Sequence, residues 1–589
     1  MKKTMKKTKI ICTIGPASEK EETLRKLMLA GMNVARLNFS HGSHEEHKER
    51  IDTIKKLREE LELPIGIMLD TKGPEIRIGN FKDKEVYLEE GQYFTLTTRE
   101  VLGDKNIVNV AYEGLPKDVK VGDRILIDDG LIELNVVEIK DSTEVICLVK
   151  NGGSVTDHKG VNVPGVKVNL PAVTQKDYED ILFGIENDVD FIAASFIRKA
   201  ENVLEIRRIL EEHGGEHIHI ISKIENQEAV DNIDEILKVS DGLMVARGDL
   251  GVEITTEEIP IVQKQLIKKC NEVGKPVITA TQMLDSMMRN PRPTRAEVTD
   301  VANAIFDGTD TIMLSGETAA GKYPLESVKT MFNIAIKAES ALDYKQIFKT
   351  KSEVNGISST NAISKATCTT AQDLGASAIL TATSSGYTAS AVSKFRPKAP
   401  IIAATTTEAV MRRLSIVWGV YPVLSEETSS TDEVIDLSIH SALEKDFIAQ
   451  GDLIVITAGI PVGVSGTTNL IKVHTVSERL LKGVGIGNKA ITGKVVVGDS
   501  AKELERKFNN GDVIVCNSTD RDMMRYIERA SAIITEQGGL TSHAAIVGLN
   551  LNLPTVVGVQ DATVELKDGD IVTVDSITGS IYKGEARIL

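Results

Sequence analysis

The sequence has few cysteines and no long apolar run. Its five cysteines are scattered over 589 residues, and none stands in a C-x-x-C pair. This spacing counts against a disulfide framework or a zinc site, so we expect reduced thiols. No apolar run approaches the length that spans a bilayer, and the basic N-terminus leads into a short strand-like run rather than a signal-peptide core. We therefore expect a cytoplasmic protein without a membrane segment.

The chain also lacks an excess of positive charge. Its formal net charge is −16 at pH 7, with 41% hydrophobic and 26% charged residues. These proportions are typical of a globular protein, and the length predicts about three to five domains. The acidic balance disfavours binding to nucleic acid or acidic membranes. An anionic substrate must then be held by metal ions and a few placed Arg and Lys side chains.

Short apolar runs, each ending in polar or glycine residues, alternate with helical patterns. We expect strands at Lys9–Gly15, Asn33–Ser40, Pro64–Thr71, Phe191–Ile197, His219–Glu225, Gly242–Asp249, Pro276–Met283 and Thr311–Gly316. The helical patterns include Glu21–Ala30, His44–Leu61, Lys199–His213, Thr256–Val273 and Pro324–Leu342. This alternation predicts a parallel sheet in an α/β fold, and eight units favour a closed (β/α)8 TIM barrel. A doubly wound open sheet is the alternative, but polar residues at the strand ends favour the barrel, whose active sites lie there.

Further segments interrupt and follow the barrel pattern. Between the third and fourth strands, five strand patterns separated by turn signals predict an inserted β-barrel lid domain, hinged at Pro74 and Pro171. These patterns are Val86–Leu88, Tyr93–Thr97, Arg124–Ile127, Leu131–Ile139 and Glu144–Val149. A second α/β series has strands at Ser377–Thr383, Pro400–Ala404, Val420–Leu424, Asp452–Thr457 and Leu470–Val476. The glycine-rich segment Lys482–Gly487 is expected to be a linker to a last domain.

We therefore expect four domains. They are a barrel of residues 1–74 and 171–351, a lid of residues 75–170, an α/β allosteric domain of residues 352–476, and a C-terminal domain of residues 477–589.

One lysine and two carboxylates stand at the ends of neighbouring barrel strands. Lys223 and Glu225 are two positions apart, so both side chains point to the same face of a strand, with Ile224 packing behind them. Asp249 ends the next strand and can supply a second metal oxygen. A solvated ion pair is the alternative explanation for Lys-x-Glu. The residues at the other strand ends decide between a functional site and a solvated ion pair.

The second and third strands end in oxygen-bearing side chains. Arg36, Asn38 and Ser40 alternate along one face, and Asp70 with Thr71 ends the next strand. An all-oxygen set suits a hard cation, although each residue alone could serve in helix capping or a loop hydrogen bond. Thr281, at the end of strand seven, caps a turn or joins a proton relay.

Several segments, in order along the chain, resemble the signature segments of the pyruvate kinase family. They are Thr13–Ser18, Arg36–Gly42, Leu69–Arg77, Ile220–Asn226, Val245–Gly251, Ala280–Ser286 and Ser315–Pro324. The resemblance covers residues from about 8 to 476. It implies transfer of a phosphoryl group from phosphoenolpyruvate to ADP, giving pyruvate and ATP, by an enzyme that is typically tetrameric and allosteric.

The resemblance also implies roles for the strand-end residues. Lys223 would stabilise the transferring phosphoryl group, and Glu225 with Asp249 would bind Mg²⁺ or Mn²⁺. Arg36 would hold the substrate phosphate, and the Gly248–Asp249 turn its carboxylate. A phosphoryl transition state is loose and anionic, so cations and positioning supply most of the catalysis and no nucleophilic side chain is required.

The resemblance also implies residues for proton transfer, for a monovalent cation and for the nucleotide. Thr281 would lie near the carbon that is protonated after the enolate forms. Arg77, and Lys159 on the lid, would meet nucleotide phosphates, and Glu75 is the residue type of potassium-dependent members. The residues that match the K⁺ site of the family are Asn38, Ser40, Asp70 and Thr71.

A hydroxyl-rich loop in the α/β domain resembles the sugar-phosphate effector loop of the family. It follows a strand and opens a helix, where amides and the helix dipole favour an anion, although an N-cap is the alternative. The effector residues would be Thr383, Ser384, Ser385, Gly386 and Thr388. The later loop Ala458–Gly466 lacks the Trp and Arg that bisphosphate-activated relatives use. We therefore expect a monophosphate activator, such as AMP or ribose 5-phosphate.

The last domain resembles the phosphohistidine segment of dikinases that use phosphoenolpyruvate. The match is Glu536–Ala545, which includes His543. No candidate ATP-grasp domain accompanies it, so a retained structural or interface module of the swivelling β/β/α type is expected. A dikinase-type phosphotransferase that uses His543 is one rival function. A non-catalytic metabolite sensor is another, but a sensor has no need to keep Lys223, Glu225, Asp249 and Thr281 together.

Overall fold

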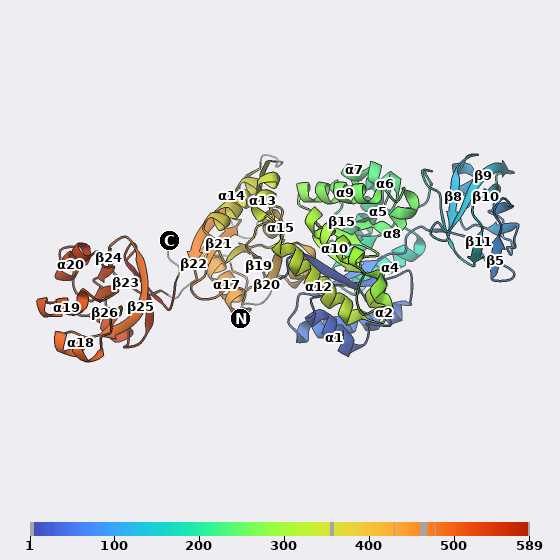
Figure 1. Ribbon diagram of the computed structural model, residues 1–589. Helices are drawn as coiled ribbons and strands as arrows, with labels where there is room; N and C mark the ends of the chain where they lie inside the picture. Colours follow the sequence, from blue (N-terminus) through green and yellow to red (C-terminus); the bar gives the residue numbers. More distant parts are fainter. Residues whose placement is uncertain (1–4, 354–357, 429, 460–467, 477–478, 587–589) are drawn as a thin grey trace.

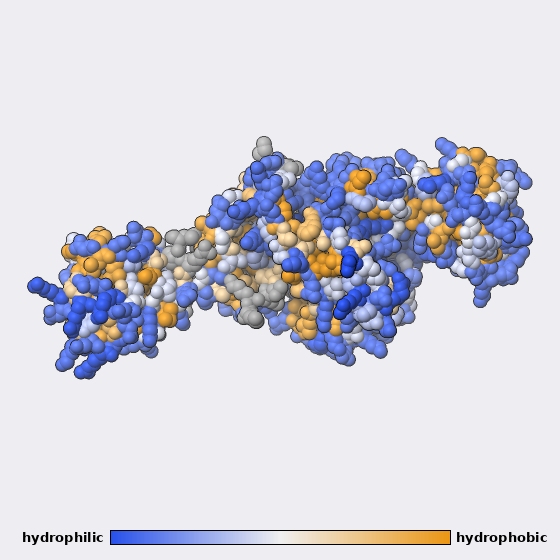
Figure 2. All heavy atoms as spheres, in the orientation of Figure 1, coloured by the Kyte–Doolittle hydropathy of each residue, from blue (hydrophilic) through white to orange (hydrophobic). Residues whose placement is uncertain are grey.

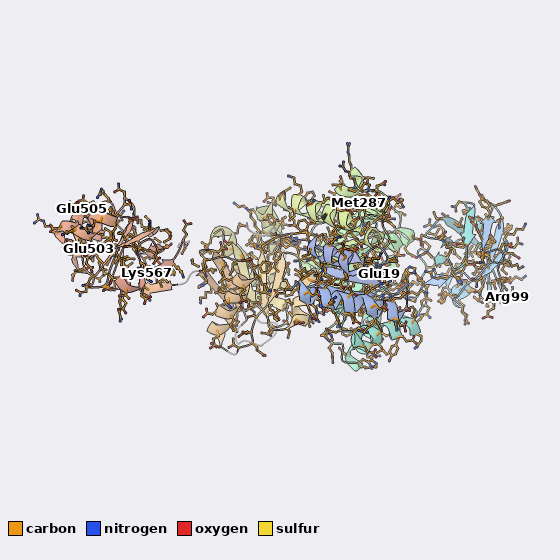
Figure 3. The ribbon with its side chains drawn as sticks, turned by 90° about the horizontal axis from the view of Figure 1, so that it is seen from below. Glu19, Arg99, Met287, Glu503, Glu505 and Lys567 are labelled. Atoms are coloured by element: carbon orange, nitrogen blue, oxygen red, sulfur yellow. The ribbon has the colours of Figure 1, made fainter. Side chains whose placement is uncertain are left out.

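The computed structural model describes residues 5–353, 358–428, 430–459, 468–476 and 479–586. Four units lie in a row, with the β insert at one end and the C-terminal unit at the other (Figure 1). Seen from below, Arg99 lies on the outer part of the insert and Glu503 in the C-terminal unit (Figure 3). Hydrophilic atoms cover most of the face in Figure 2. No helix in the described ranges has the length and hydropathy needed to cross a bilayer.

The central unit is a closed barrel of eight parallel strands in the order β1-β17-β16-β15-β14-β13-β3-β2. These strands are β1 (Lys9–Thr13), β2 (Val34–Asn38), β3 (Gly66–Asp70), β13 (Phe191–Ala194), β14 (His219–Ile224), β15 (Gly242–Ala246), β16 (Val277–Ala280) and β17 (Thr311–Leu314). Each lies within an apolar run predicted to be a strand. The predicted barrel is confirmed, and the open doubly wound sheet is excluded.

Helices cover the outside of the barrel between its strands. They are α1 (Glu21–Leu29), α2 (His44–Glu60), α4 (Gln175–Glu186), α5 (Ala200–Glu212), α7 (Ile233–Val239), α9 (Ile259–Val273), α10 (Arg295–Asp307) and α12 (Pro324–Ser340). The short helices α6 (Gln227–Asp231), α8 (Arg247–Glu253) and α11 (Gly316–Ala319) follow the ends of β14, β15 and β17. Helix α13 (Tyr344–Glu353) packs through Phe348 with the core of the third unit. The capping box of Ser43 and Glu46 begins α2, and Gly274 in the left-handed conformation ends α9. The candidate site residues stand at the carboxyl ends of the barrel strands, which lie together at one face of the barrel.

The insert after β3 is a seven-stranded sheet in the order β4-β12-β8-β9-β10-β6-β7, with a two-stranded sheet of β5 and β11. Its strands are β4 (Ile76–Arg77), β5 (Glu85–Leu88), β6 (Tyr93–Thr97), β7 (Ile107–Asn109), β8 (Arg124–Ile127), β9 (Ile132–Lys140), β10 (Glu144–Val149), β11 (Gly153–Thr156) and β12 (Gly160–Asn162). A bridge between Ile78 and Val110 joins the two edges of the larger sheet. The sheet therefore closes on itself, as expected for a small β-barrel.

The third unit is an α/β sheet in the order β20-β19-β18-β21-β22, in which β22 alone is antiparallel to its neighbour. Its elements are α14 (Ser359–Asp373), β18 (Ala378–Ala382), α15 (Tyr387–Ser393), β19 (Ile401–Thr405), α16 (Glu408–Arg413), η2 (Leu414–Ile416), β20 (Val420–Leu424), α17 (Thr431–Glu444), β21 (Leu453–Ala458) and β22 (Leu470–Thr475). Ile416 is fully buried and packs with the interior residues of the barrel, including Val34 and Met68. The α/β unit thus closes one end of the barrel core.

The C-terminal unit is an eight-stranded sheet in the order β23-β30-β29-β25-β26-β27-β28-β24. Its elements are β23 (Arg479–Lys482), β24 (Val484–Ile486), β25 (Ala490–Val497), α18 (Ala501–Lys507), β26 (Val513–Cys516), α19 (Met524–Ile527), β27 (Ala532–Thr535), α20 (His543–Leu551), β28 (Thr555–Val557), α21 (Ala562–Glu565), β29 (Ile571–Asp575) and β30 (Ser580–Lys583).

The prediction that Lys482–Gly487 is a linker is wrong. The segment supplies part of β23 and all of β24, which pair antiparallel with β30 and β28. A Cβ atom at Gly483 or Gly485 would lie less than 3.0 Å from a backbone oxygen. These glycines therefore permit a close approach of two backbones within a sheet, and their pattern was mistaken for chain flexibility.

Candidate active site

The ends of β2, β3 and β14 hold two cations on one buried carboxylate. Arg36 Nε donates to Asp70 Oδ2 at 2.6 Å, and Lys223 Nζ donates to Asp70 Oδ1 at 3.1 Å. Asp70 is 1% exposed. Burial acts to raise the pKa of Asp70, but the two cations outweigh it and hold this pKa below its usual value. Arg36, Asp70 and Lys223 therefore form one charged unit.

Lys223 and Glu225 lie on the same face of the strand end, as their spacing predicts. Lys223 Nζ is 2.9 Å from Glu225 Oε1, while Ile224 is fully buried in the outer core. The pair is buried, so the alternative of a solvated ion pair is wrong. Burial acts to lower the pKa of Lys223, but Asp70 and Glu225 outweigh it and raise this pKa, which keeps the ammonium charged at neutral pH.

Glu225, which is buried, and Asp249, which is half-buried, form a carboxylate pair that suits a divalent cation. Burial raises the pKa of Glu225 to about 7, with Asp249 adding to the rise and Lys223 opposing it. Burial also raises the pKa of Asp249. Glu225 Oε1 accepts no hydrogen bond in the described structure, although its ion pair with Lys223 is close. Two carboxylates of this kind fit Mg²⁺ or Mn²⁺.

The rest of a metal shell would come from outside the protein. The described ranges contain no cluster of three or more His, Cys, Asp or Glu side chains arranged for a metal ion. Mg²⁺ is commonly bound by one or two carboxylates together with substrate phosphates and water. The pair of Glu225 and Asp249 matches that mode of binding.

A loop that the sequence analysis did not single out supports this centre. Ser195 Oγ accepts from Lys223 Nζ at 2.8 Å and donates to the Thr71 carbonyl at 2.6 Å. The Phe196 amide donates to Glu225 Oε2 at 2.6 Å, and Phe196 has a left-handed φ of 53°. Such strain in a bulky residue marks a functional position. The signal that could have found the loop is Ser195, a polar residue that ends the apolar run of β13.

Gly248 and Thr281 meet at the ends of β15 and β16. The Gly248 amide donates to Thr281 Oγ1 at 2.9 Å, and Arg247 Nη2 donates to the Thr281 carbonyl at 2.7 Å. Arg247 is itself paired with Asp300 at 2.8 Å. Thr281 has a φ of 65°, an unfavourable conformation for a β-branched side chain. Its hydroxyl is thus held beside the turn that carries Asp249.

The predicted K⁺ ligands lie at two paired strand ends. Asn38 stands in register with Asp70, and Asn38 Oδ1 accepts from the Ser40 amide at 3.2 Å. Thr71 Oγ1 accepts from the Ser195 amide at 3.1 Å. A carboxylate oxygen has more than one lone pair, so Asp70 can hold Arg36 and still offer an oxygen to a cation. This oxygen-rich set fits a hard monovalent cation.

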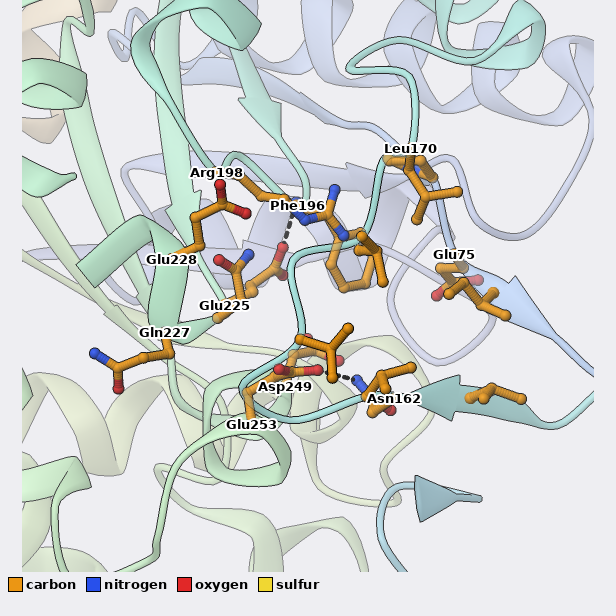
Figure 4. A pocket seen from close by; sticks show the side chains of 18 of the residues that line it. Glu75, Asn162, Leu170, Phe196, Arg198, Glu225, Gln227, Glu228, Asp249 and Glu253 are labelled. Atoms are coloured by element: carbon orange, nitrogen blue, oxygen red, sulfur yellow. Dashed lines mark hydrogen bonds between the residues drawn. The ribbon is translucent and has the colours of Figure 1, made fainter. Parts of the chain in front are cut away.

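A pocket lies between the barrel mouth and the insert, and Figure 4 shows its lining, with Glu225 and Asp249 on the barrel side. Arg77 and Lys159 also line it. Arg77 Nη2 pairs with Glu75 at 2.6 Å, and Lys159 Nζ pairs with Asp128 at 2.8 Å. Arg77 and Lys159 thus share a pocket with the carboxylates of Glu225 and Asp249, and each of the two cations has its own carboxylate partner.

A hydrogen bond joins the insert to the barrel in this pocket. Asn162 Nδ2, in β12, donates to Glu253 Oε1, at the end of α8, at 3.0 Å. Asp249 lies in the first turn of the same helix. The position of the insert is therefore linked to the helix that carries Asp249.

The predicted effector loop lies away from this pocket, between β18 and α15. Thr383 Oγ1 accepts from the Gly386 amide at 2.9 Å, and Ser385 Oγ accepts from the Tyr387 amide at 3.4 Å. Thr388 Oγ1 hydrogen-bonds to Thr468 Oγ1 at 2.9 Å. The hydroxyls thus cap the loop's own amides. The prediction of a monophosphate activator rests on the loop Ala458–Gly466. Residues 460–466 of this loop lie outside the described ranges.

His543 begins α20 in the C-terminal unit and is exposed. Its Nδ1 lies 2.8 Å from Thr519 Oγ1. This contact orients the imidazole ring through Nδ1. Helix α20, which begins at His543, lies in the unit at one end of the row, and the α/β unit lies between that unit and the barrel (Figure 1).

Family models match three parts of the chain. They are "Pyruvate kinase, barrel domain" at residues 5–328, "Pyruvate kinase, alpha/beta domain" at residues 361–474, and "PEP-utilising enzyme, mobile domain" at residues 508–579. The first alone covers more than half of the chain. The order of the matches follows the order of the units described above.

Curated relatives match over the whole length. The pyruvate kinase of Bacillus licheniformis is 57% identical over 99% of this chain and 100% of its own, and that of Geobacillus stearothermophilus is 56% identical over the same shares. A solved pyruvate kinase from Cryptosporidium parvum is 42% identical, with a TM-score of 0.76 over 80% of this chain and 96% of its own. With the barrel model matched and these identities over nearly the full length, the chain belongs to the pyruvate kinase family.

Proposed function

We propose that the protein transfers the phosphoryl group of phosphoenolpyruvate to ADP, giving pyruvate and ATP, at the mouth of the (β/α)8 barrel. The observation that carries this proposal is the buried unit in which Lys223 lies within 3.1 Å of Asp70 and 2.9 Å of Glu225. This unit places a fixed positive charge beside a carboxylate pair suited to a metal. Such an arrangement stabilises an anionic phosphoryl transition state without a covalent intermediate.

The position of each side chain supports the catalytic role that we assign to it. Lys223 is the cation for the transferring phosphoryl group, because its carboxylate neighbours keep it charged. Arg36 binds the phosphate of the substrate, and the backbone turn of Gly248 and Asp249 faces its carboxylate end. Thr281, held by Gly248 at 2.9 Å, stands where a hydroxyl can guide a proton to the enolate carbon.

Two cations complete the site in this proposal. Glu225 and Asp249 would hold Mg²⁺ or Mn²⁺, which when bound would neutralise phosphate charge. The K⁺ ligands would be Asn38, Ser40, Asp70 and Thr71.

The insert of residues 75–170 acts as a lid over the nucleotide in this proposal. Arg77 and Lys159, which line the pocket below it, bind ADP or ATP phosphates. Residues 1–74 and 171–351 are the catalytic unit. Closure of a lid excludes water, and water exclusion protects a reactive phosphoryl group from hydrolysis.

Regulation is assigned to the α/β unit of residues 352–476. A monophosphate effector, a sugar phosphate or AMP, binds at Thr383, Ser384, Ser385, Gly386 and Thr388 within a cytoplasmic homotetramer. The hydroxyls that cap this loop can exchange their amide partners for phosphate oxygens. Stronger activation of the initial rate by fructose 1,6-bisphosphate than by either AMP or ribose 5-phosphate would refute the monophosphate assignment.

Residues 477–589 form a structural or interface unit in this proposal. The α/β unit lies between the unit that contains His543 and the barrel (Figure 1), and none of the four units in the described ranges was predicted to be an ATP-grasp domain that could exchange phosphate with His543. Acid-labile phosphate on His543 after incubation with phosphoenolpyruvate, absent from His543→Ala, would favour the dikinase alternative instead.

The direct test is pyruvate formation by the full chain from phosphoenolpyruvate and ADP. We expect turnover that needs Mg²⁺ or Mn²⁺ and rises with K⁺. AMP plus phosphate should not replace ADP as substrate or product. Absence of pyruvate under these conditions would contradict the proposal and favour the metabolite sensor.

A further inference from the structure

The loop between β13 and α5 brings a positive charge into the pocket that the roles above do not use. Arg198 lines the pocket, and its side chain extends into it beside Phe196 (Figure 4). The Arg198 amide donates to Asn202 Oδ1 at 3.0 Å, and its carbonyl accepts from Asn232 Nδ2 at 3.0 Å. The guanidinium is therefore carried by a backbone that is fixed on both sides.

Arg198 differs from the other cations that line the pocket. Arg77 and Lys159 each form an ion pair with a carboxylate, and Lys167 is exposed at the rim. Arg198 is half-buried, and within the described ranges no carboxylate oxygen lies within 4.0 Å of its guanidinium. A cation that is neither paired nor fully hydrated is available for a ligand.

The surroundings of Arg198 favour an oxyanion over water. Burial lowers the pKa of Arg198, and the more distant carboxylates of Glu228 and Glu253 offset this only in part. The guanidinium has thus lost hydration without gaining a direct partner. A planar guanidinium pairs with a phosphate through two parallel hydrogen bonds, which lysine cannot form.

The position of Arg198 indicates which of the two anionic substrates it would bind. Arg36 and Lys223 already lie together on Asp70, in the centre assigned to phosphoenolpyruvate. Arg198 shares the pocket with Arg77 and Lys159, whose charges are balanced by carboxylates. A diphosphate bound there needs a further unpaired cation.

We propose that Arg198 binds a phosphate oxygen of the nucleoside diphosphate and is a determinant of ADP affinity. The inference rests on the proposed function of this pocket. One loop then serves both halves of the site, because Ser195 and Phe196 hold Lys223 and Glu225 while Arg198 holds the nucleotide.

The test compares Arg198→Gln and Arg198→Lys with the matched control Arg208→Gln, which removes an exposed arginine from α5. The KM values for ADP and for phosphoenolpyruvate are measured separately, together with the Kd of ADP alone with Mg²⁺. We expect Arg198→Gln to raise both ADP constants by about tenfold or more, the size of a lost charged hydrogen bond. Arg198→Lys should recover part of the loss, and Arg208→Gln should match the parent.

Three results for Arg198→Gln would overturn the assignment. The first is an unchanged KM and Kd for ADP, and the second is a rise confined to the KM of phosphoenolpyruvate. The third is an equal rise of the KM for both substrates together with a lower melting temperature, which would mean a structural role. If the parent forms no pyruvate, the proposed function fails, whereas the Kd of ADP still reports separately on Arg198.

Discussion

The contact between the α/β unit and the barrel gives a quantitative prediction. Arg412, in α16, is 6% exposed, and its Nε donates to Asp190 Oδ1 at 2.6 Å. Asp190, just before β13, is 1% exposed and also accepts from the Ile67 amide at 2.8 Å. Arg412→Met removes the positive partner and leaves the carboxylate buried. Arg58, at 3.8 Å, is the cation that remains near it.

The expected loss follows from these distances. At an effective dielectric constant of about 20, the attraction between unit charges at 2.6 Å is about 6 kcal/mol, and that of Arg58 at 3.8 Å is about 4 kcal/mol. Breaking one partner of a buried pair typically costs about 3–5 kcal/mol, so with Arg58 in place we expect about 3 kcal/mol. For a cooperative unit of about 150–250 residues, that lowers Tm by about 6–12 °C.

Calorimetry of Arg412→Met at several pH values is the assay, with Arg289→Met as the matched control. Arg289 pairs with Asp285 at 3.2 Å, but their side chains are 71% and 49% exposed, so its loss should cost less than about 1 kcal/mol. Arg412→Met combined with Asp190→Asn should recover part of the stability, because the amide oxygen still accepts from Ile67 without a buried charge.

The pH dependence gives a further criterion. Burial raises the pKa of Asp190, and Arg412 opposes that rise. Without Arg412 this pKa rises further above its unfolded value, so the folded variant binds a proton as the pH falls. Its stability deficit should then shrink from pH 8 towards pH 5. A deficit equal to that of Arg289→Met, or one that does not change with pH, would refute the reasoning.

Two other substitutions test the effect of a buried lysine on stability and the need for glycine where two backbones approach closely. Burial lowers the pKa of Lys9 to about 7, so the folded state binds fewer protons than the unfolded state up to about pH 10. Lys9 should therefore add to stability as the pH rises above 7, by at most about 1.4 kcal/mol per pH unit, and Lys9→Met should make the slope of stability against pH less steep in melting curves. The same slope in Lys9→Met as in the parent would contradict the assignment. Gly485→Ala should destabilise the C-terminal sheet by about 3 kcal/mol through a backbone clash, whereas Gly539→Ala, with no atom within 4 Å of its new Cβ, should be tolerated. Hydrogen exchange should localise the change to β24 and β28, and equal exchange in both variants would count against it.

The strand-end residues of the barrel were predictable from the sequence because one rule connects them. A parallel barrel brings the carboxyl ends of all its strands to one face, so Lys223, Glu225 and Asp70 could be placed together once eight apolar runs were recognised. The two-residue period of a strand also predicted that Lys223 and Glu225 share a face.

The contacts that fix these residues could not be predicted in the same way. The link from Lys223 to Ser195 depends on the register between β13 and β14 and on a strained φ at Phe196, which no local pattern encodes. The packing of Ile416 into the barrel core joins segments far apart in the chain. The glycine-rich segment around β24 was wrongly predicted to be a linker, because glycine occurs both in flexible segments and where two backbones approach closely.

The role of Lys223 is tested most directly by Lys223→Met, assayed for pyruvate formation and for binding of phosphoenolpyruvate on the same preparation. Lys238→Met, an exposed lysine on α7, is the control. We predict that Lys223→Met lowers kcat by at least about a thousandfold, because its charge acts on the transition state, while substrate binding largely survives. A kcat within about tenfold of the parent would contradict the account.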